Sequence, residues 1–348
     1  MKKLLIIIFV SFISLFGFIS LFNKEEISIY ERRKLKAFPK IKDNNNFFDD
    51  LDKYLSDHFI LRQDFREVKG FVNYNLFNIS INNKVTIKDD YLFELTETNY
   101  KSLDNIVDKV DDIIKRFEIN DYEFIAIPLK NHYAGLDNVS EEIDEYLGVR
   151  MDNYHSLKDL LSLSDYYRTD IHLKQERLGS VVSKILELCD VEEKDIEYSF
   201  NTYDKFYGSL YAKMAISMKP DTITYLTNDL LNSIKVYSVE DKDLLDVYNV
   251  SELESLDPYS IYLNGPKAYL KIVNEDVKNR KLIIFRDSYT SSFAPLMLEG
   301  YKRIILLDLR YASLTNLLGK VNIKNDDTDI LFLYSTSLIN GSDVLKVK

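Results

Sequence analysis

The sequence predicts an α/β fold, with a mainly parallel central sheet and helices on both of its faces. Compact apolar runs, typical of buried parallel strands, occur at residues 122–129, 222–226, 281–285, 303–307 and 329–334. Runs with apolar residues at helical spacing occur at 103–117, 178–188, 210–218 and 312–318. Because crossover helices connect parallel strands, the alternation of the two kinds of run predicts this architecture.

Composition excludes several classes of function. With 348 residues, 46% of them apolar, the chain is long enough for one large core or for a core with an appendage. The net charge of -11 is spread over short runs without a basic stripe, which argues against nucleic-acid binding. The single cysteine, Cys189, excludes an intramolecular disulfide. The four histidines show no i, i+4 pair, so we expect no metal site. The sequence contains no glycine-rich nucleotide motif, so we expect no other cofactor.

The N-terminus predicts a membrane anchor. After Met1-Lys2-Lys3, residues 4–22 are free of charged side chains and approach the ~20 residues that a membrane helix requires. No small-x-small cleavage site follows, so we expect residues 1–23 to be an uncleaved signal anchor. The two lysines predict a cytoplasmic N-terminus, which makes the protein a single-pass protein of the cell membrane with the remainder outside the cytoplasm.

Residues 24–83 are expected to form a juxtamembrane spacer followed by amphipathic helices. A polar segment closes at Pro39, and apolar residues then recur at helical spacing as far as Val72. His58 in this region is expected to be a structural surface residue rather than a catalytic base. The strand and helix alternation begins near residue 84, so we expect residues 84–348 to form one α/β domain, which would be the catalytic domain if the candidate residues described below act together.

Ser288 is the candidate nucleophile. The apolar strand at 281–285 runs into Arg286-Asp287-Ser288, and a predicted helix follows. In open α/β sheets ligands gather at the carboxyl ends of the strands, and a helix N-terminus adds backbone N–H donors there. The alternative is that Asp287 or Ser288 only caps the helix, and this motif taken alone favours the cap.

Asp170 and His172 are the candidate partners of Ser288. If the backbone turns between them, Asp170 can orient the imidazole while its other nitrogen meets the serine. The alternative is a solvent-exposed pair that leads into the next helix. His132, which follows a strand end, is a rival base, and His155 is a weaker one.

Gly208 and Ser209 are candidates for the oxyanion hole. They open a predicted helix, where a backbone N–H can donate to a developing oxyanion. Equally, Gly208 can simply end a loop and Ser209 can simply cap the helix.

An ordered set of short blocks resembles the DHHW-type proteins, which are similar to the periplasmic alginate O-acetyltransferases of the AlgJ/AlgX kind. The blocks lie at residues 31–32, 54–62, 168–172, 206–210, 287–289 and 308–311. The name-giving Asp-His-His-Trp reads Asp170-Ile171-His172-Leu173 here, so its first histidine and its tryptophan are missing. The resemblance implies an SGNH-hydrolase-like, three-layer fold behind the membrane helix and a short helical juxtamembrane region.

The resemblance also implies a reaction. Ser288 would be the nucleophile, His172 the base and Asp170 its orienter, with no cofactor. An acetyl group would arrive from a membrane-bound O-acyltransferase and pass to a polysaccharide hydroxyl. Asp308 and Arg310 would be candidate substrate-binding residues, although an ion pair that shapes the sheet edge is the alternative for them.

The sequence therefore leads to the hypothesis of an extracytoplasmic, serine-dependent O-acetyltransferase that modifies a cell-surface or exported polysaccharide through an acyl-enzyme. Two alternatives stay open. The same triad with water as acceptor makes a carbohydrate acetylesterase, and a protein of this fold without catalysis makes a glycan-binding subunit of an acetylation complex.

Overall fold

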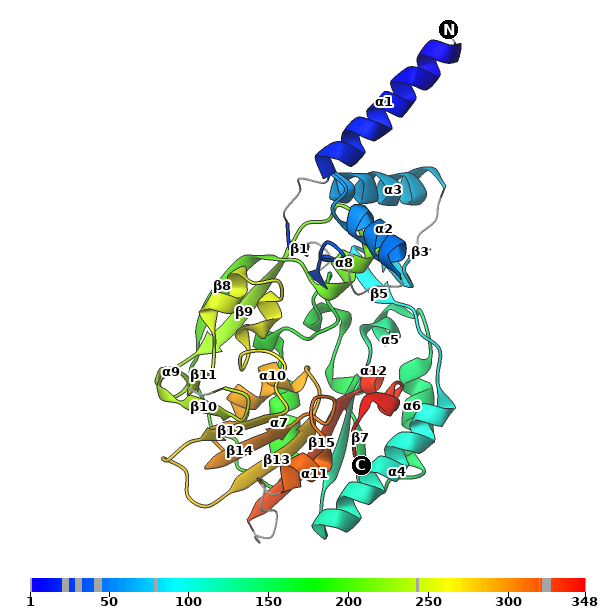
Figure 1. Ribbon diagram of the computed structural model, residues 1–348. Coiled ribbons are helices and arrows are strands. Elements are labelled where there is room, and N and C mark those ends of the chain that lie inside the picture. Colours follow the sequence, from blue (N-terminus) through cyan, green and yellow to red (C-terminus); the bar gives the residue numbers. More distant parts are fainter. Residues whose placement is uncertain are drawn as a thin grey trace.

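The computed structural model describes residues 2–20, 25–28, 33–40, 46–77, 81–241, 244–318, 320 and 327–347. An apolar helix, α1 (Lys2–Ser20), projects from an α/β body (Figure 1). Within α1, residues 3–20 are long and apolar enough to cross a membrane. Residues 1 and 21–23 of the predicted anchor and the 31–32 block of the resemblance lie outside the described residues.

The body is built on a mixed sheet of eight strands in the order β11-β10-β12-β14-β13-β15-β6-β7. The bounds along that order are Leu245–Asp246, Lys235–Ser238, Tyr269–Val273, Arg303–Leu307, Lys281–Arg286, Thr328–Ser335, Glu123–Ile127 and Tyr154–Ser156. The strands from β14 to β7 are parallel, as predicted. The sequence did not predict the other edge, where β12, β10 and β11 pair antiparallel.

Helices cover both faces of this sheet. All of β13 is buried, with Leu282 and Ile284 in one core cluster and Ile283 and Phe285 in the other. The first cluster lies under α7 (Gly179–Leu188) and α10 (Thr290–Phe293). The second lies under α4 (Tyr100–Phe117), α6 (Val139–Gly148), α11 (Leu314–Leu318) and α12 (Thr336–Ile339). A strand covered on both sides has to be apolar throughout, which explains the compact run at 281–285.

Two predicted elements differ from the structure. The run at 222–226 belongs to β9 (Asp221–Thr227), which pairs antiparallel with β8 (Ser199–Phe206) in a separate two-stranded sheet. Within β9, Ile223 is buried and Thr222 is exposed, which is the alternation of a half-buried strand. The helix predicted at 210–218 is shorter, because α8 (Ser209–Met214) ends where Ala215 adopts a left-handed conformation with φ 53°.

Smaller elements complete the fold. A three-stranded sheet contains β3 (Ile81–Asn82), β4 (Val85–Lys88) and β5 (Tyr91–Glu94), and β1 (Ile27–Ser28) pairs with β2 (Arg33–Lys34). The remaining α-helices are α2 (Phe47–Asp57), α3 (Arg62–Leu76), α5 (Lys130–Ala134) and α9 (Asp229–Ser233). Short 3-10 helices occur at Lys158–Leu160, Leu163–Asp165, Gln175–Arg177, Val250–Glu254, Pro258–Ile261, Ala294–Met297 and Ser342–Val344.

The segments that follow α1 are joined by polar contacts. The Arg33 guanidinium donates to both oxygens of Asp57, at 2.6 and 2.9 Å, and this contact lowers the pKa of Asp57 to about 2. His58 is buried, with its ring nitrogens 3.0 Å from the carbonyl oxygens of Tyr54 and Glu25. The expectation of a surface histidine was therefore wrong, because the chain segment before β1 covers the end of α2.

Candidate functional site

Ser288 lies at the carboxyl edge of the sheet, directly after β13 and before α10. Its neighbour Asp287 is buried and closes the turn. The Asp287 carboxylate accepts hydrogen bonds from the Tyr289 N–H at 3.0 Å, the Ser335 N–H at 2.8 Å and the Ser335 hydroxyl at 2.6 Å. Asp287 thereby ties the end of β13 to the end of β15, which leaves Ser288 partly exposed.

The structure brings Asp170, His172 and Ser288 into one hydrogen-bonded row. His172 Nε2 lies 2.9 Å from Ser288 Oγ, and Nδ1 lies 2.5 Å from Asp170 Oδ1. Because a carboxylate accepts but does not donate, Nδ1 carries the proton and Nε2 accepts from the serine hydroxyl. The imidazole also stacks on the ring of Tyr259, with centroids 3.9 Å apart and planes at 10°. This is the geometry of a nucleophile, a base and an orienting carboxylate.

A second carboxylate holds the segment that carries Asp170. Asp221, at the start of β9, is buried and accepts hydrogen bonds from the Thr169 N–H at 2.8 Å and the Thr169 hydroxyl at 2.6 Å. The Arg168 N–H donates to its other oxygen at 3.1 Å. The turn that the Asp-x-His pair requires is thus held by Asp221, a residue about fifty positions later in the chain.

The backbone amides of Gly208 and Ser209 also hold this segment. The Gly208 N–H donates to Thr169 Oγ1 at 3.0 Å, and the Ser209 N–H donates to Asp170 Oδ2 at 2.7 Å. These two amides orient the carboxylate of Asp170. The expectation that they present donors to an oxyanion is not met, because both hydrogens already have acceptors inside the protein.

Asp308 and Arg310 form an ion pair at the end of β14. Asp308 is fully buried, and it accepts from Arg310 Nε at 2.9 Å and from a terminal guanidinium nitrogen at 2.6 Å. The contacts of Asp308 and Arg310 are therefore those of the alternative, an ion pair that shapes the edge of the sheet.

The rival bases lie in other pairs. His132, on α5, is 2.5 Å from Glu141, and His155, on β7, is 2.7 Å from Glu123.

Sequence reasoning missed Lys130, as it missed Asp221. The buried ammonium of Lys130 donates to the carbonyl oxygens of Tyr167 at 3.0 Å, Arg168 at 3.1 Å and Asp170 at 2.7 Å. Burial lowers the pKa of this amine to about 7. The only signal in the sequence is a lysine directly after a buried strand, at the edge where ligands gather.

This lowered pKa predicts a pH dependence of stability. Between pH about 7 and pH 10.5 the unfolded chain keeps the Lys130 proton while the folded protein releases it, so this group makes the free energy of unfolding rise with pH. The Lys130→Met variant lacks that contribution. Denaturant unfolding in detergent at pH about 7 and about 9 should therefore show wild type gaining stability relative to the variant. If the free energy of unfolding changed with pH by the same amount in both proteins, the prediction would be contradicted.

A cavity of about 570 Å³ opens beside the row, lined in part by Asp170, His172 and Ser209. Arg33 of β2 and Arg66 of α3 also line it. The region between α1 and the three-stranded sheet therefore supplies part of the wall of the cavity.

No protein-family model matches the chain. No curated protein matches it either. Solved structures with a similar fold include a DHHW family protein from Eubacterium siraeum, with 18% identity and a TM-score of 0.60 over 77% of this chain and 98% of that one. Bacillus cereus PatB1 has 18% identity and a TM-score of 0.60, over 76% of this chain and 99% of PatB1. PatB1 with a sulfonyl adduct has 16% identity and a TM-score of 0.59 over the same shares. At these identities the likeness shows the fold, and the likeness to the AlgJ/AlgX kind stays a prediction.

Proposed function

We propose that this protein is a serine O-acyltransferase that passes an acetyl group to a hydroxyl of a cell-surface or exported polysaccharide. The observation that carries the proposal is the row of Ser288, His172 and Asp170, with 2.9 and 2.5 Å between successive partners. The fold shared with a DHHW family protein and with PatB1 supports it. One PatB1 structure carries a sulfonyl adduct, and sulfonyl reagents combine with activated nucleophiles.

In the first half of this reaction, Ser288 Oγ attacks the acyl carbonyl while His172 Nε2 takes its proton. The bond to the leaving group then breaks, and His172 returns the proton to that group. An acetyl ester of Ser288 remains. Asp170 stabilises the imidazolium that forms between the two proton transfers.

In the second half, an acceptor hydroxyl gives its proton to His172 and attacks the acetyl ester. The product ester forms, and Ser288 recovers its hydrogen. In the part of the chain that the structure describes, the Ser288 N–H donates no hydrogen bond. That amide is therefore our candidate donor to the oxyanion, in place of Gly208 and Ser209.

The acceptor site, on this proposal, is the cavity beside His172. Its polar lining includes Asn83, Lys213 and Asp257, side chains whose amide, ammonium and carboxylate groups can form hydrogen bonds with the hydroxyl groups of a sugar. The acetyl donor is proposed to be a membrane-bound O-acyltransferase, which fits a catalytic domain tethered outside the cytoplasm by α1.

Intact mass tests the proposal. The full chain, incubated with an activated acetyl ester, is expected to gain the mass of one acetyl group, and peptide mapping should place it on Ser288. The Ser180→Ala variant, altered at an exposed serine of α7, should acquire the same adduct. An adduct confined to another residue, or none at all, would refute the acyl-enzyme.

The acetylated protein also separates transfer from hydrolysis. Loss of the adduct that accelerates with glycan concentration supports the transferase. Loss at the same rate with and without glycan supports the acetylesterase instead.

A further inference from the structure

Helix α3 presents an apolar face to the outside. Three residues on this face are about half exposed: Leu61, which precedes the helix, at 51%, Phe65 at 50% and Val68 at 58%. They recur at four-residue and three-residue spacing, which places them on one side of the helix. Leu76, near the end of the helix, continues this side and is also exposed.

The opposite face of α3 is fixed to the body. The Arg66 guanidinium donates to the carbonyl oxygen of Ala212 at 2.8 Å. A Cβ on Gly70 would lie 2.5 Å from the carbonyl oxygen of Ala215, so only glycine permits this approach. Because both contacts are to α8 and the residue after it, α3 is held with its apolar side turned away from the body.

The end of α1 meets the start of α3. The Ile60 N–H donates to Ser20 Oγ at 3.0 Å, and the ring of Phe16 stacks on the ring of Phe59 with centroids 6.1 Å apart. Figure 1 shows α3 running across the base of α1, between α1 and the body. A bilayer that contains α1 would therefore end where α3 lies.

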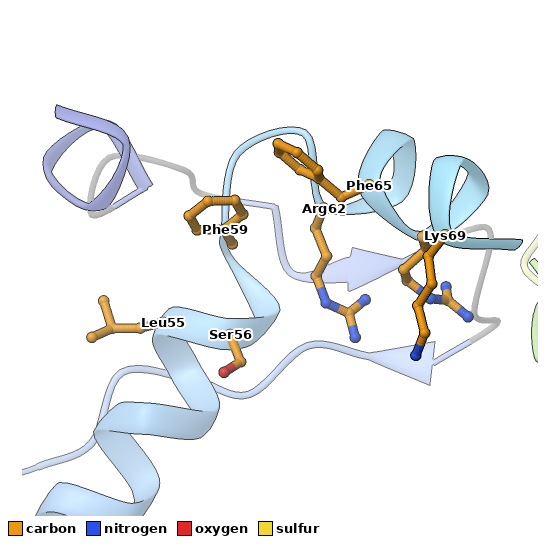
Figure 2. A pocket seen from close by; sticks show the side chains of 7 residues that line it. Leu55, Ser56, Phe59, Arg62, Phe65 and Lys69 are labelled. Carbon is orange, nitrogen blue, oxygen red and sulfur yellow. The ribbon is translucent and has the colours of Figure 1, made fainter. Parts of the chain in front are cut away.

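A groove of about 460 Å³ beside α3 combines aromatic and basic side chains. It is lined by Leu55, Ser56, Phe59, Arg62, Phe65, Arg66 and Lys69. Figure 2 shows the rings of Phe59 and Phe65 on one side and the charged ends of Arg62 and Lys69 directed to the other. The chain as a whole has a net charge of -11, so a local cluster of cations is unusual on it. Such a cluster attracts negatively charged groups.

We propose that α3 lies in the headgroup region of the membrane that contains α1 and that its groove binds anionic phospholipid. The apolar face meets the acyl chains, while Arg62 and Lys69 meet the phosphates. An amphipathic helix with apolar and basic sides is the structure that binds such an interface. Arg66 also lines the cavity beside His172, so this placement keeps that cavity at the membrane surface. The inference does not depend on the proposed reaction.

Tryptophan fluorescence tests it, since the chain contains no tryptophan of its own. The full chain carrying Phe65→Trp is placed in nanodiscs of phosphatidylcholine and phosphatidylglycerol with brominated acyl chains. The variant is expected to lose most of its emission to the bromine. Val149→Trp is the control, because Val149 is 80% exposed and follows α6, near the amino end of β7 and away from α3.

Val68→Trp repeats the measurement at a second position of the face. Omitting phosphatidylglycerol should weaken the quenching at both positions, and Lys69→Gln should remove part of this lipid dependence. Emission at positions 65 and 68 as bright as at 149 would overturn the proposal. A blue-shifted but unquenched emission would also overturn it, because protein rather than lipid would then cover the face.

Discussion

Alanine in place of Ser288 is expected to lower acetyl transfer by a factor of about 10⁴ or more, because the acyl-enzyme cannot form without Oγ. Among the described residues, the side chain that forms a hydrogen bond with this hydroxyl is His172, whose Nε2 lies 2.9 Å away. Folding should hardly change, since the turn around Ser288 is held by the carboxylate of Asp287. The measurement is acetyl release from an activated ester, with and without glycan, alongside thermal unfolding. Ser180→Ala is the matched control and should retain wild-type rates.

His172→Ala is the companion test of the same row. If both variants were expressed and folded normally and surface acetylation stayed at the wild-type level, the catalytic proposal would be lost. The chain would then fit the third hypothesis, a glycan-binding subunit of an acetylation complex.

The parallel centre of the sheet could be predicted because burial on both faces leaves a direct trace in the sequence. The run at 303–307 coincides with β14, and the run at 329–334 lies within β15. The antiparallel edge left no such trace: β10 and β11 are short, and their pairing depends on loops that return the chain to the sheet. The run at 222–226 was misplaced for a related reason, since a few apolar residues do not reveal which strand they pair with.

The candidate row could be proposed from local patterns, but the residues that hold it could not. Lys130, Asp221 and Gly208 all act on residues 168–170 from about forty to fifty positions away. A lysine after a strand or an aspartate before one is usually a solvated side chain, so neither stands out. His58 illustrates the same limit, because its burial depends on a carbonyl oxygen of Glu25 in another segment.

These supporting contacts converge on the backbone around Asp170 from three directions. Lys130 donates to its carbonyl oxygen, Ser209 donates to its carboxylate, and Asp221 holds the preceding Thr169. Two residues of flexible chain do not by themselves keep a carboxylate within 2.5 Å of an imidazole. The short distances within the row therefore depend on the surrounding residues. A substitution among those residues should slow the reaction even though Asp170, His172 and Ser288 are unchanged.

Gly208→Ala is expected to show this. An added Cβ would lie 2.3 Å from Asp170 Cβ and 2.5 Å from the carbonyl oxygen of Thr169, closer than real Cβ atoms approach. The backbone of Gly208 has φ -80°, so the obstacle is space rather than conformation. Asp170 or the start of α8 must move, and we expect a loss of about 100-fold or more in kcat/KM for the activated ester. Overpacking should also cost about 1–3 kcal/mol of stability.

Gly179→Ala separates the positional effect from glycine replacement in general. Gly179 opens α7, and in the described part of the chain no atom beyond its own helix and its chain neighbours lies within 4 Å of an added Cβ. That variant should stay within about 0.5 kcal/mol of wild type and keep full activity. Rates for Gly208→Ala must be compared at a temperature where near-ultraviolet circular dichroism shows the variant folded. Wild-type kcat/KM under those conditions would mean that the approach of α8 to Asp170 has no part in the reaction. A large loss would show that the contacts to Gly208 and Ser209 position the orienting carboxylate.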